Sequence, residues 1–305
     1  MIGYLFPGQG TVRVGMGGWL RRDPVGARVF AVADEVHAGL DDGGLAELCA
    51  RGPLERLVAT DVAQPVVTAC NLAALEVLRS RGHAPDVVAG HSVGELSALC
   101  AADVLDVEAT LRLVATRSRL MAALPLVGGM SAVLGLTEER VAELAAEASA
   151  PGEPAVVGLV NGPDNIVVSG ALPALLRLAE LAVDARKVVP LKVGGAFHSP
   201  LMAGAVDDWA EAVRATPMRP PSVPVVPNVT AEPTTDLATI TDALIDQLTG
   251  RVRWAETVRR LADVDTCVEV GDSKTLAGLH RGVGGRCLSM ADPTAVRRLR
   301  AESAA

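Results

Sequence analysis

A serine flanked by glycines is the clearest chemical signal in the chain. It is Ser92 in the segment Gly90–Gly94 (GHSVG), and a short apolar run at 86–89 precedes it. A helical run begins at about 94, so the segment has the strand, turn and helix of a G-x-S-x-G nucleophile elbow. On such a turn the helix start offers backbone N–H groups and a positive dipole end to a developing oxyanion. The chain has 30 glycines, so the motif alone could occur by chance, and its context is what favours a nucleophile.

A serine nucleophile needs a general base, and the chain has five histidines. His198 lies in a loop directly after an apolar strand, where catalytic side chains are commonly placed. His91 is adjacent to Ser92, and on an elbow it would point away from the serine. The remaining three lie in helical or loop positions: His37, His83 and His280. The residues alone favour His198 and leave the others open. A histidine base would lose activity as the pH falls through about 6–7, the usual imidazole range.

The composition argues against several other classes of protein. Hydrophobic residues make up 50% of the chain and charged residues 21%, as in a folded globular protein. The formal charge of −8 argues against nucleic-acid binding. No apolar stretch reaches the length of about 18 residues that a membrane span needs. The five cysteines form no C-x-x-C pair, which favours buried, reduced thiols and a cytoplasmic protein.

Hydrophobic periodicity predicts the elements that position these residues. Outside the middle of the chain it predicts strands at 2–6, 86–89, 223–227 and 266–270, and helices at 27–50, 64–82, 94–103, 107–123, 201–215, 236–249, 254–263 and from about 274. Between 127 and 196 the order becomes strand, helix, strand, strand, helix, strand, which is that of a ferredoxin-like split βαβ unit. We therefore expect an α/β protein with a core made of 1–126 and 197–305 and a small inserted subdomain at 127–196.

A series of motifs along the chain carries a family resemblance. They are Leu5 through Gly10 (LFPGQG), Gln64-Pro65, Gly90 through Glu95, Arg117, Asn161 through Gly170, Ala196 through Met202, Asn228-Val229, and Gln247 with Val252 through Trp254. Over about residues 3–290 the chain resembles the malonyl-CoA:acyl-carrier-protein transacylases, members of the acyltransferase family of fatty acid and polyketide synthesis. The resemblance implies an α/β-hydrolase-like core with a ferredoxin-like insert.

The resemblance also implies a catalytic constellation. Ser92 would be the nucleophile and His198 its base. The backbone carbonyl of Gln247 would orient the imidazole in place of the usual aspartate. The backbone N–H groups of Gln9 and Val93 would form the oxyanion hole.

Three further residues are implied as contacts of the substrate. Arg117 would pair with the free carboxylate of a malonyl group, and Gln64 and Asn161 would line the same site. Without the resemblance, Arg117 would be interpreted as a surface arginine, Gln64 as a helix cap and Asn161 as a turn residue. Several positions depart from the family pattern and lie around the expected acyl pocket: Thr11-Val12, Ser118, Asn165, Arg251 and Gly271 through Ser273.

We therefore expect a cytoplasmic, monomeric acyltransferase that moves a malonyl or related acyl group from CoA to the pantetheine thiol of an acyl carrier protein, through an acyl-serine. No metal or redox cofactor is implied, acyl-CoA and the carrier protein being substrates. Two alternatives stay open. The enzyme could move an unusual acyl unit between two carrier proteins of a natural-product pathway, or it could be a serine thioesterase or hydrolase.

Overall fold

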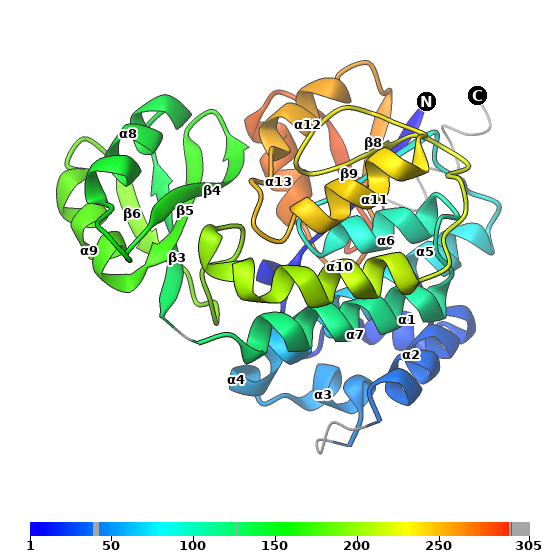
Figure 1. The fold of residues 1–305 in the computed structure, drawn as a ribbon. Coiled ribbons are helices and arrows are strands. Elements are labelled where there is room, and N and C mark those ends of the chain that lie inside the picture. The colour runs from blue at the N-terminus through cyan, green and yellow to red at the C-terminus, as the bar shows by residue number, and fades with distance from the viewer. Residues whose placement is uncertain (39–42, 126, 293, 295–305) are drawn as a thin grey trace.

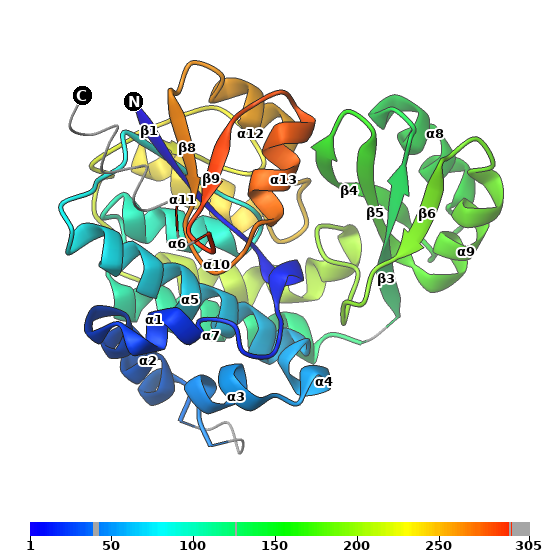
Figure 2. The same cartoon turned by 180° about the vertical axis from the view of Figure 1, so that it is seen from behind.

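The protein contains a parallel and an antiparallel β-sheet, each with its own helices (Figures 1 and 2). The computed structural model describes residues 1–38, 43–125, 127–292 and 294. The predicted α/β class is therefore confirmed. The proposed boundary at residue 126 lies outside the described residues, and the division into core and subdomain stays a prediction.

The parallel sheet has the strand order β7-β2-β1-β8-β9. Its strands are β1 (Ile2–Phe6), β2 (Val87–Gly90), β7 (Val225–Val226), β8 (Thr266–Glu269) and β9 (Cys287–Ser289). Phe6 at the end of β1 pairs with Gly90 at the end of β2, so the loops that follow these strands emerge side by side. In an open parallel sheet this carboxyl edge is where ligands bind.

Helices surround the parallel sheet. They are α1 (Gly18–Arg22), α2 (Pro24–Val36), α3 (Leu45–Arg51), α4 (Leu54–Leu57), α5 (Thr60–Arg79), α6 (Gly94–Ala101), α7 (Val107–Ala123), α10 (Val206–Ala215), α11 (Leu237–Asp246), α12 (Trp254–Arg260) and α13 (Thr275–Gly282), with 3-10 turns η1 (Gln9–Thr11) and η2 (Pro200–Ala205). By length and composition α5 is apolar enough to cross a membrane. However, 89% of its most apolar window is buried inside the protein, so α5 is a core helix.

The antiparallel sheet has the strand order β4-β5-β3-β6. Its elements are β3 (Gly128–Leu134), α8 (Glu138–Ala148), β4 (Ala155–Gly162), β5 (Asn165–Ala171), α9 (Leu172–Leu181) and β6 (Lys187–Pro190), in the predicted order. Because strand side chains alternate between faces, Val133 and Val168 pack with α8 and α9 while Ala132 and Val167 face the rest of the protein.

Two helix predictions were wrong, and short elements such as α1, α4 and β9 were not predicted. The helix expected over 27–50 is interrupted between α2 and α3, where Gly43 and Gly44 adopt positive φ angles of +79° and +99°. The helix expected to open at Gln64 begins at Thr60, so Gln64 lies inside α5 and is not its cap. A proline usually marks a first turn, but here burial on nearly every side holds the helix around Pro65. The strand β9 was not predicted, because three residues carry too little pattern.

Candidate active site

Ser92 lies on a strained turn between β2 and α6. Its backbone has a φ of +54°, a left-handed conformation that is uncommon for a residue with a side chain. A Cβ atom at Gly90 would overlap the backbone of Gly94, and one at Gly94 would overlap the carbonyl of Phe6. The two glycines of the motif therefore allow β2 and α6 to approach closely, and Ser92 lies on the sharp turn between them. The structure has the geometry that the sequence predicts for an elbow.

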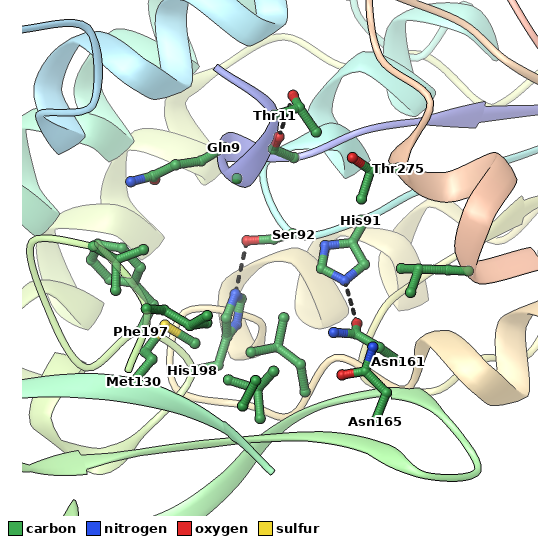
Figure 3. Close-up of a pocket in the computed structure, with 18 of the residues that line it drawn as sticks. Gln9, Thr11, His91, Ser92, Met130, Asn161, Asn165, Phe197, His198 and Thr275 are labelled. Atoms are coloured by element: carbon green, nitrogen blue, oxygen red, sulfur yellow. Dashed lines mark hydrogen bonds between the residues drawn. The ribbon is translucent and has the colours of Figure 1, made fainter. Parts of the chain in front are cut away.

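Ser92 and His198 are in direct contact although 106 residues separate them. Ser92 Oγ lies 2.8 Å from His198 Nε2, and Figure 3 shows the two side chains pointing at one another. His198 Nδ1 lies 2.9 Å from the carbonyl oxygen of Gln247 and 3.2 Å from that of Gly250. A carbonyl oxygen can only accept a hydrogen bond, so Nδ1 carries the proton and Nε2 accepts from the serine hydroxyl. This is the tautomer that a general base requires.

One of the carbonyl groups that face His198 belongs to the end of helix α11, and the other, that of Gly250, lies in the turn that follows. Gln247 caps this helix, and the last carbonyls of a helix have no partner within it. The Gln247 carbonyl is therefore available to the imidazole, and the negative end of the helix dipole favours an imidazolium formed there. The structure thus brings the backbone of Gln247 to His198, and Gly250 is a second acceptor that was not predicted.

Two backbone N–H groups lie at the carboxyl edge of the parallel sheet beside Ser92. Gln9 opens the turn η1 directly after β1, and Val93 immediately precedes α6. In the described part of the chain, no acceptor is found for either N–H group. Gln9 and Ser92 both line the same pocket. This arrangement can receive a developing oxyanion.

Arg117 lies behind the elbow and is not a surface arginine. Its side chain is 1% exposed on α7. Its Nη1 donates to Gln64 Oε1 at 2.6 Å, and its Nη2 donates to Gln247 Oε1 at 2.8 Å. Burial is the main reason that its pKa falls to about 10. The sequence analysis placed Arg117 and Gln64 at one site, and the structure brings their side chains together.

Two residues that the sequence analysis gave no role complete this polar cluster. Glu95 is fully buried in the first turn of α6, and its Oε2 accepts from Gln247 Nε2 at 2.7 Å and from the backbone N–H of Asn228 at 3.1 Å. Asn228 follows β7, and its Oδ1 accepts from the N–H of Ser92 at 2.7 Å. Both residues lie within the quoted family motifs, but only the fold reveals their partners.

Burial changes the pKa values of the ionisable groups at the site. It is the main cause that lowers the pKa of His198 to about 3, with the positive charge of Arg117 adding to the effect. The pKa of about 6–7 that the sequence predicts for this base was therefore wrong. Burial also raises the pKa of Glu95 to about 7, against the opposing effects of its hydrogen bonds and of Arg117. At neutral pH His198 is therefore a neutral base.

In front of Ser92 is a pocket with a volume of about 410 Å³ (Figure 3). Ser92, His198 and the loop after β1 form its polar side. The antiparallel sheet and α13 supply most of its apolar wall, including Met130, Leu159, Val167, Val189 and Leu276. The pocket therefore combines one reactive edge with a largely apolar lining.

Asn161 lies at the end of β4 on the wall of this pocket. Its side-chain oxygen is 2.8 Å from Nε2 of His91, which in turn packs edge-to-face against Trp254 with ring centroids 5.3 Å apart. His91 thus points towards Asn161 and not towards Ser92 (Figure 3), as expected from its place on the elbow. The pair joins the two sheets across the pocket. Among the described residues, no group of three or more histidine, cysteine or acidic side chains could hold a metal ion.

Comparisons with known proteins agree with this geometry. The family model described as acyl transferase domain matches residues 3–283. Malonyl CoA-acyl carrier protein transacylase of Bacillus subtilis is 35% identical over 97% of this chain and 95% of its own. The acyl-carrier-protein S-malonyltransferase of Bartonella henselae superposes with a TM-score of 0.91 at 32% identity, covering 98% of both chains. A malonyl-transacylase solved in complex with its type II PKS acyl-carrier protein gives a TM-score of 0.88 at 33% identity, covering 94% of both chains.

Proposed function

The chain belongs to the acyl transferase domain family, and from this membership we propose that it moves a malonyl group from coenzyme A to the pantetheine thiol of an acyl carrier protein. It is an acyltransferase. The observation that carries the proposal is the 2.8 Å contact between Ser92 Oγ, on its strained turn, and Nε2 of His198. The malonyl cargo is inferred from the relatives, and the residue roles are proposed for this chain.

In the first half-reaction, Ser92 attacks the thioester carbonyl of malonyl-CoA. His198 takes the hydroxyl proton on Nε2 while Gln247 holds Nδ1–H, and the N–H groups of Gln9 and Val93 stabilise the oxyanion. Collapse of this intermediate expels the CoA thiolate, which takes the proton from His198. An ester between the malonyl group and Ser92 remains.

In the second half-reaction, the pantetheine thiol of the carrier protein attacks that ester. His198 removes the thiol proton and then returns it to Ser92 Oγ as the acyl group departs on the carrier. The same imidazole thus serves both steps, and its neutral form is the one that burial favours.

We propose that Arg117 selects the cargo by pairing with the malonyl carboxylate. Two of its five N–H groups donate to Gln64 and Gln247, and among the described residues the other three have no partner. A substrate carboxylate would add to these bonds or replace the glutamine oxygens. A buried bidentate pair of this kind discriminates against neutral acyl groups. Asn161, with His91, would line the opposite wall of the entrance.

We also propose that the core is α/β-hydrolase-like, comprising 1–126 and 197–305, and that 127–196 is the inserted subdomain. The parallel and antiparallel sheets support this division. The protein would act as a cytoplasmic monomer without a metal or redox cofactor. The five described cysteines are buried and free, which suits a reducing compartment.

The test is intact-mass analysis after incubation with a panel of acyl-CoAs. Malonyl-CoA should give an enzyme heavier by one malonyl group, and addition of a holo acyl carrier protein should move that mass to the carrier. Preference for another acyl group would favour the natural-product alternative. Rapid release of free acid before the carrier is added would identify a thioesterase instead.

A further inference from the structure

Glu95, Gln247 and Arg117 form a buried chain behind the elbow. The amide of Gln247 bridges the two charged groups, since its Oε1 accepts from Arg117 and its Nε2 donates to Glu95. Arginine can only donate, so the orientation of this amide is fixed. The same residue holds His198 through its backbone carbonyl. Glu95 is thus linked to both the cation and the base without touching either.

The cluster is electrically balanced only while the substrate is absent. Arg117 carries one positive charge and the ionised form of Glu95 one negative charge, and both side chains are at most 1% exposed. In the described part of the chain the side-chain partners of Arg117 and Glu95 are neutral groups, and Oε1 of Glu95 has no hydrogen-bond partner. When Glu95 is ionised, one of its two carboxylate oxygens therefore lacks a hydrogen bond. A second carboxylate bound at Arg117 would leave the cluster with a buried net negative charge.

We propose that Glu95 takes up a proton from solvent when the malonyl carboxylate binds at Arg117. The carboxylate of Glu95 becomes a carboxylic acid, and the cluster again holds one cation and one anion. The inference rests on the proposed function, because it requires an anionic acyl group at Arg117. Glu95 acts here as a charge-compensating residue and does not contact the reacting atoms.

The surroundings of Glu95 support this assignment. Arg117 on α7 is the charged group that acts electrostatically on it, and burial already brings its pKa to about 7. On α5, Gln64 bonds to Arg117 and Asn71 bonds to Ser97 of α6, and both of these side chains are uncharged. Two other titratable groups lie at the site. His198 is reached through Gln247, while His91 is bonded to Asn161 and faces away.

The experiment counts the protons exchanged on binding. A Ser92→Ala chain, which cannot be acylated, is titrated calorimetrically with malonyl-CoA in buffers of different ionisation enthalpy, and acetyl-CoA serves as the matched ligand. Both ligands carry the same CoA phosphates, so their difference isolates the proton that accompanies the carboxylate. With Glu95 ionised before binding, the excess uptake should approach one proton at pH 8. It should fall towards zero at pH 6, where Glu95 is already protonated.

The matched variant is Glu95→Gln in the same Ser92→Ala chain. Its side-chain oxygen can still accept from Gln247 and Asn228, but it cannot take up a proton, so the excess should vanish at every pH. No excess in the Ser92→Ala chain at pH 8, or an excess that persists with Glu95→Gln, would overturn the inference. Failure of the wild-type chain to form a malonyl-enzyme would overturn the proposed function itself, and the inference with it.

Discussion

The two sheets contribute to the site in opposite ways. Behind Ser92, the parallel-sheet side is closed and polar, and Arg117, Gln247 and Glu95 hold one another in fixed orientations. In front of Ser92, the antiparallel sheet offers an apolar wall of residues such as Leu159 and Val189. The hydrogen bonds of the first side fix its groups atom by atom, whereas the second side is mostly an apolar surface, with Asn161 bonded to His91 at its edge.

This difference indicates where specificity and rate arise. Removing one member of a buried hydrogen-bonded network strands its partners and costs much. Trimming an apolar wall removes only the transfer free energy of the lost groups. We therefore expect substitutions behind the serine to change chemistry and choice of cargo, and substitutions in front of it to produce small effects.

The largest effect is expected from the nucleophile. Ser92→Ala should abolish the malonyl-enzyme seen by intact mass and reduce transfer by roughly 10⁴–10⁶-fold, because the hydroxyl that forms the acyl ester is removed. Ser80→Ala, at the end of α5, is the control and should retain transfer. An acyl mass on the Ser92→Ala chain would mean that another residue is the nucleophile.

Arg117 should give the next largest effect. For malonyl thioesters Arg117→Ala should lower kcat/KM by about 30-fold to several thousand-fold, which corresponds to about 2–5 kcal/mol, because the substrate carboxylate loses its buried cation. Acetyl transfer should be unchanged or improved. Arg112→Ala is the control on the same helix, since Arg112 is exposed and pairs with Glu108. If Arg117→Ala leaves malonyl transfer intact, Arg117 does not select the cargo.

The pH dependence of acylation tests the burial of His198. A base must be neutral, and the lowered pKa of about 3 keeps His198 neutral as the solution is acidified. With acetyl-CoA and the Glu95→Gln chain, in which the titration of Glu95 near pH 7 is removed, the acylation rate should change less than about threefold between pH 8 and pH 5. An imidazole of ordinary pKa would lose about 30-fold over that range. Single-turnover rates would measure this, and a midpoint near pH 6.5 would show that His198 is not sequestered in solution.

The smallest effect is expected on the apolar wall. Val189→Ala should raise KM for acyl thioesters by only about two- to tenfold, because it removes partly buried methyl groups from the pocket. Val188→Ala on the same strand is the control. Its side chain packs against the other face of the sheet, so it should leave KM unchanged and lower the melting temperature instead. A large loss of kcat with Val189→Ala would mean that the small sheet takes part in the chemistry.

Much of the local structure could be predicted from the sequence. The strand at 2–6 and the helix at 107–123 have the predicted bounds. The elbow was also evident, because its strand, glycines and helix lie within a few consecutive residues. Such features depend on neighbours along the chain, and a pattern in the sequence records those neighbours directly.

The remaining features depend on contacts between distant segments. The sequence favoured His198 among five histidines, but its partner Ser92 lies 106 residues away, and Gln247 reaches the carbonyl of Ser92 across 155 residues. Nothing in the local pattern around Glu95 indicates a bond to the end of α11. The pKa values of His198 and Glu95 could not be predicted from the sequence either, because they depend on desolvation and on the positive charge of Arg117. The sequence determined which residues could react, and only the packing of α6, α7 and α11 around the elbow decided their partners and their charge.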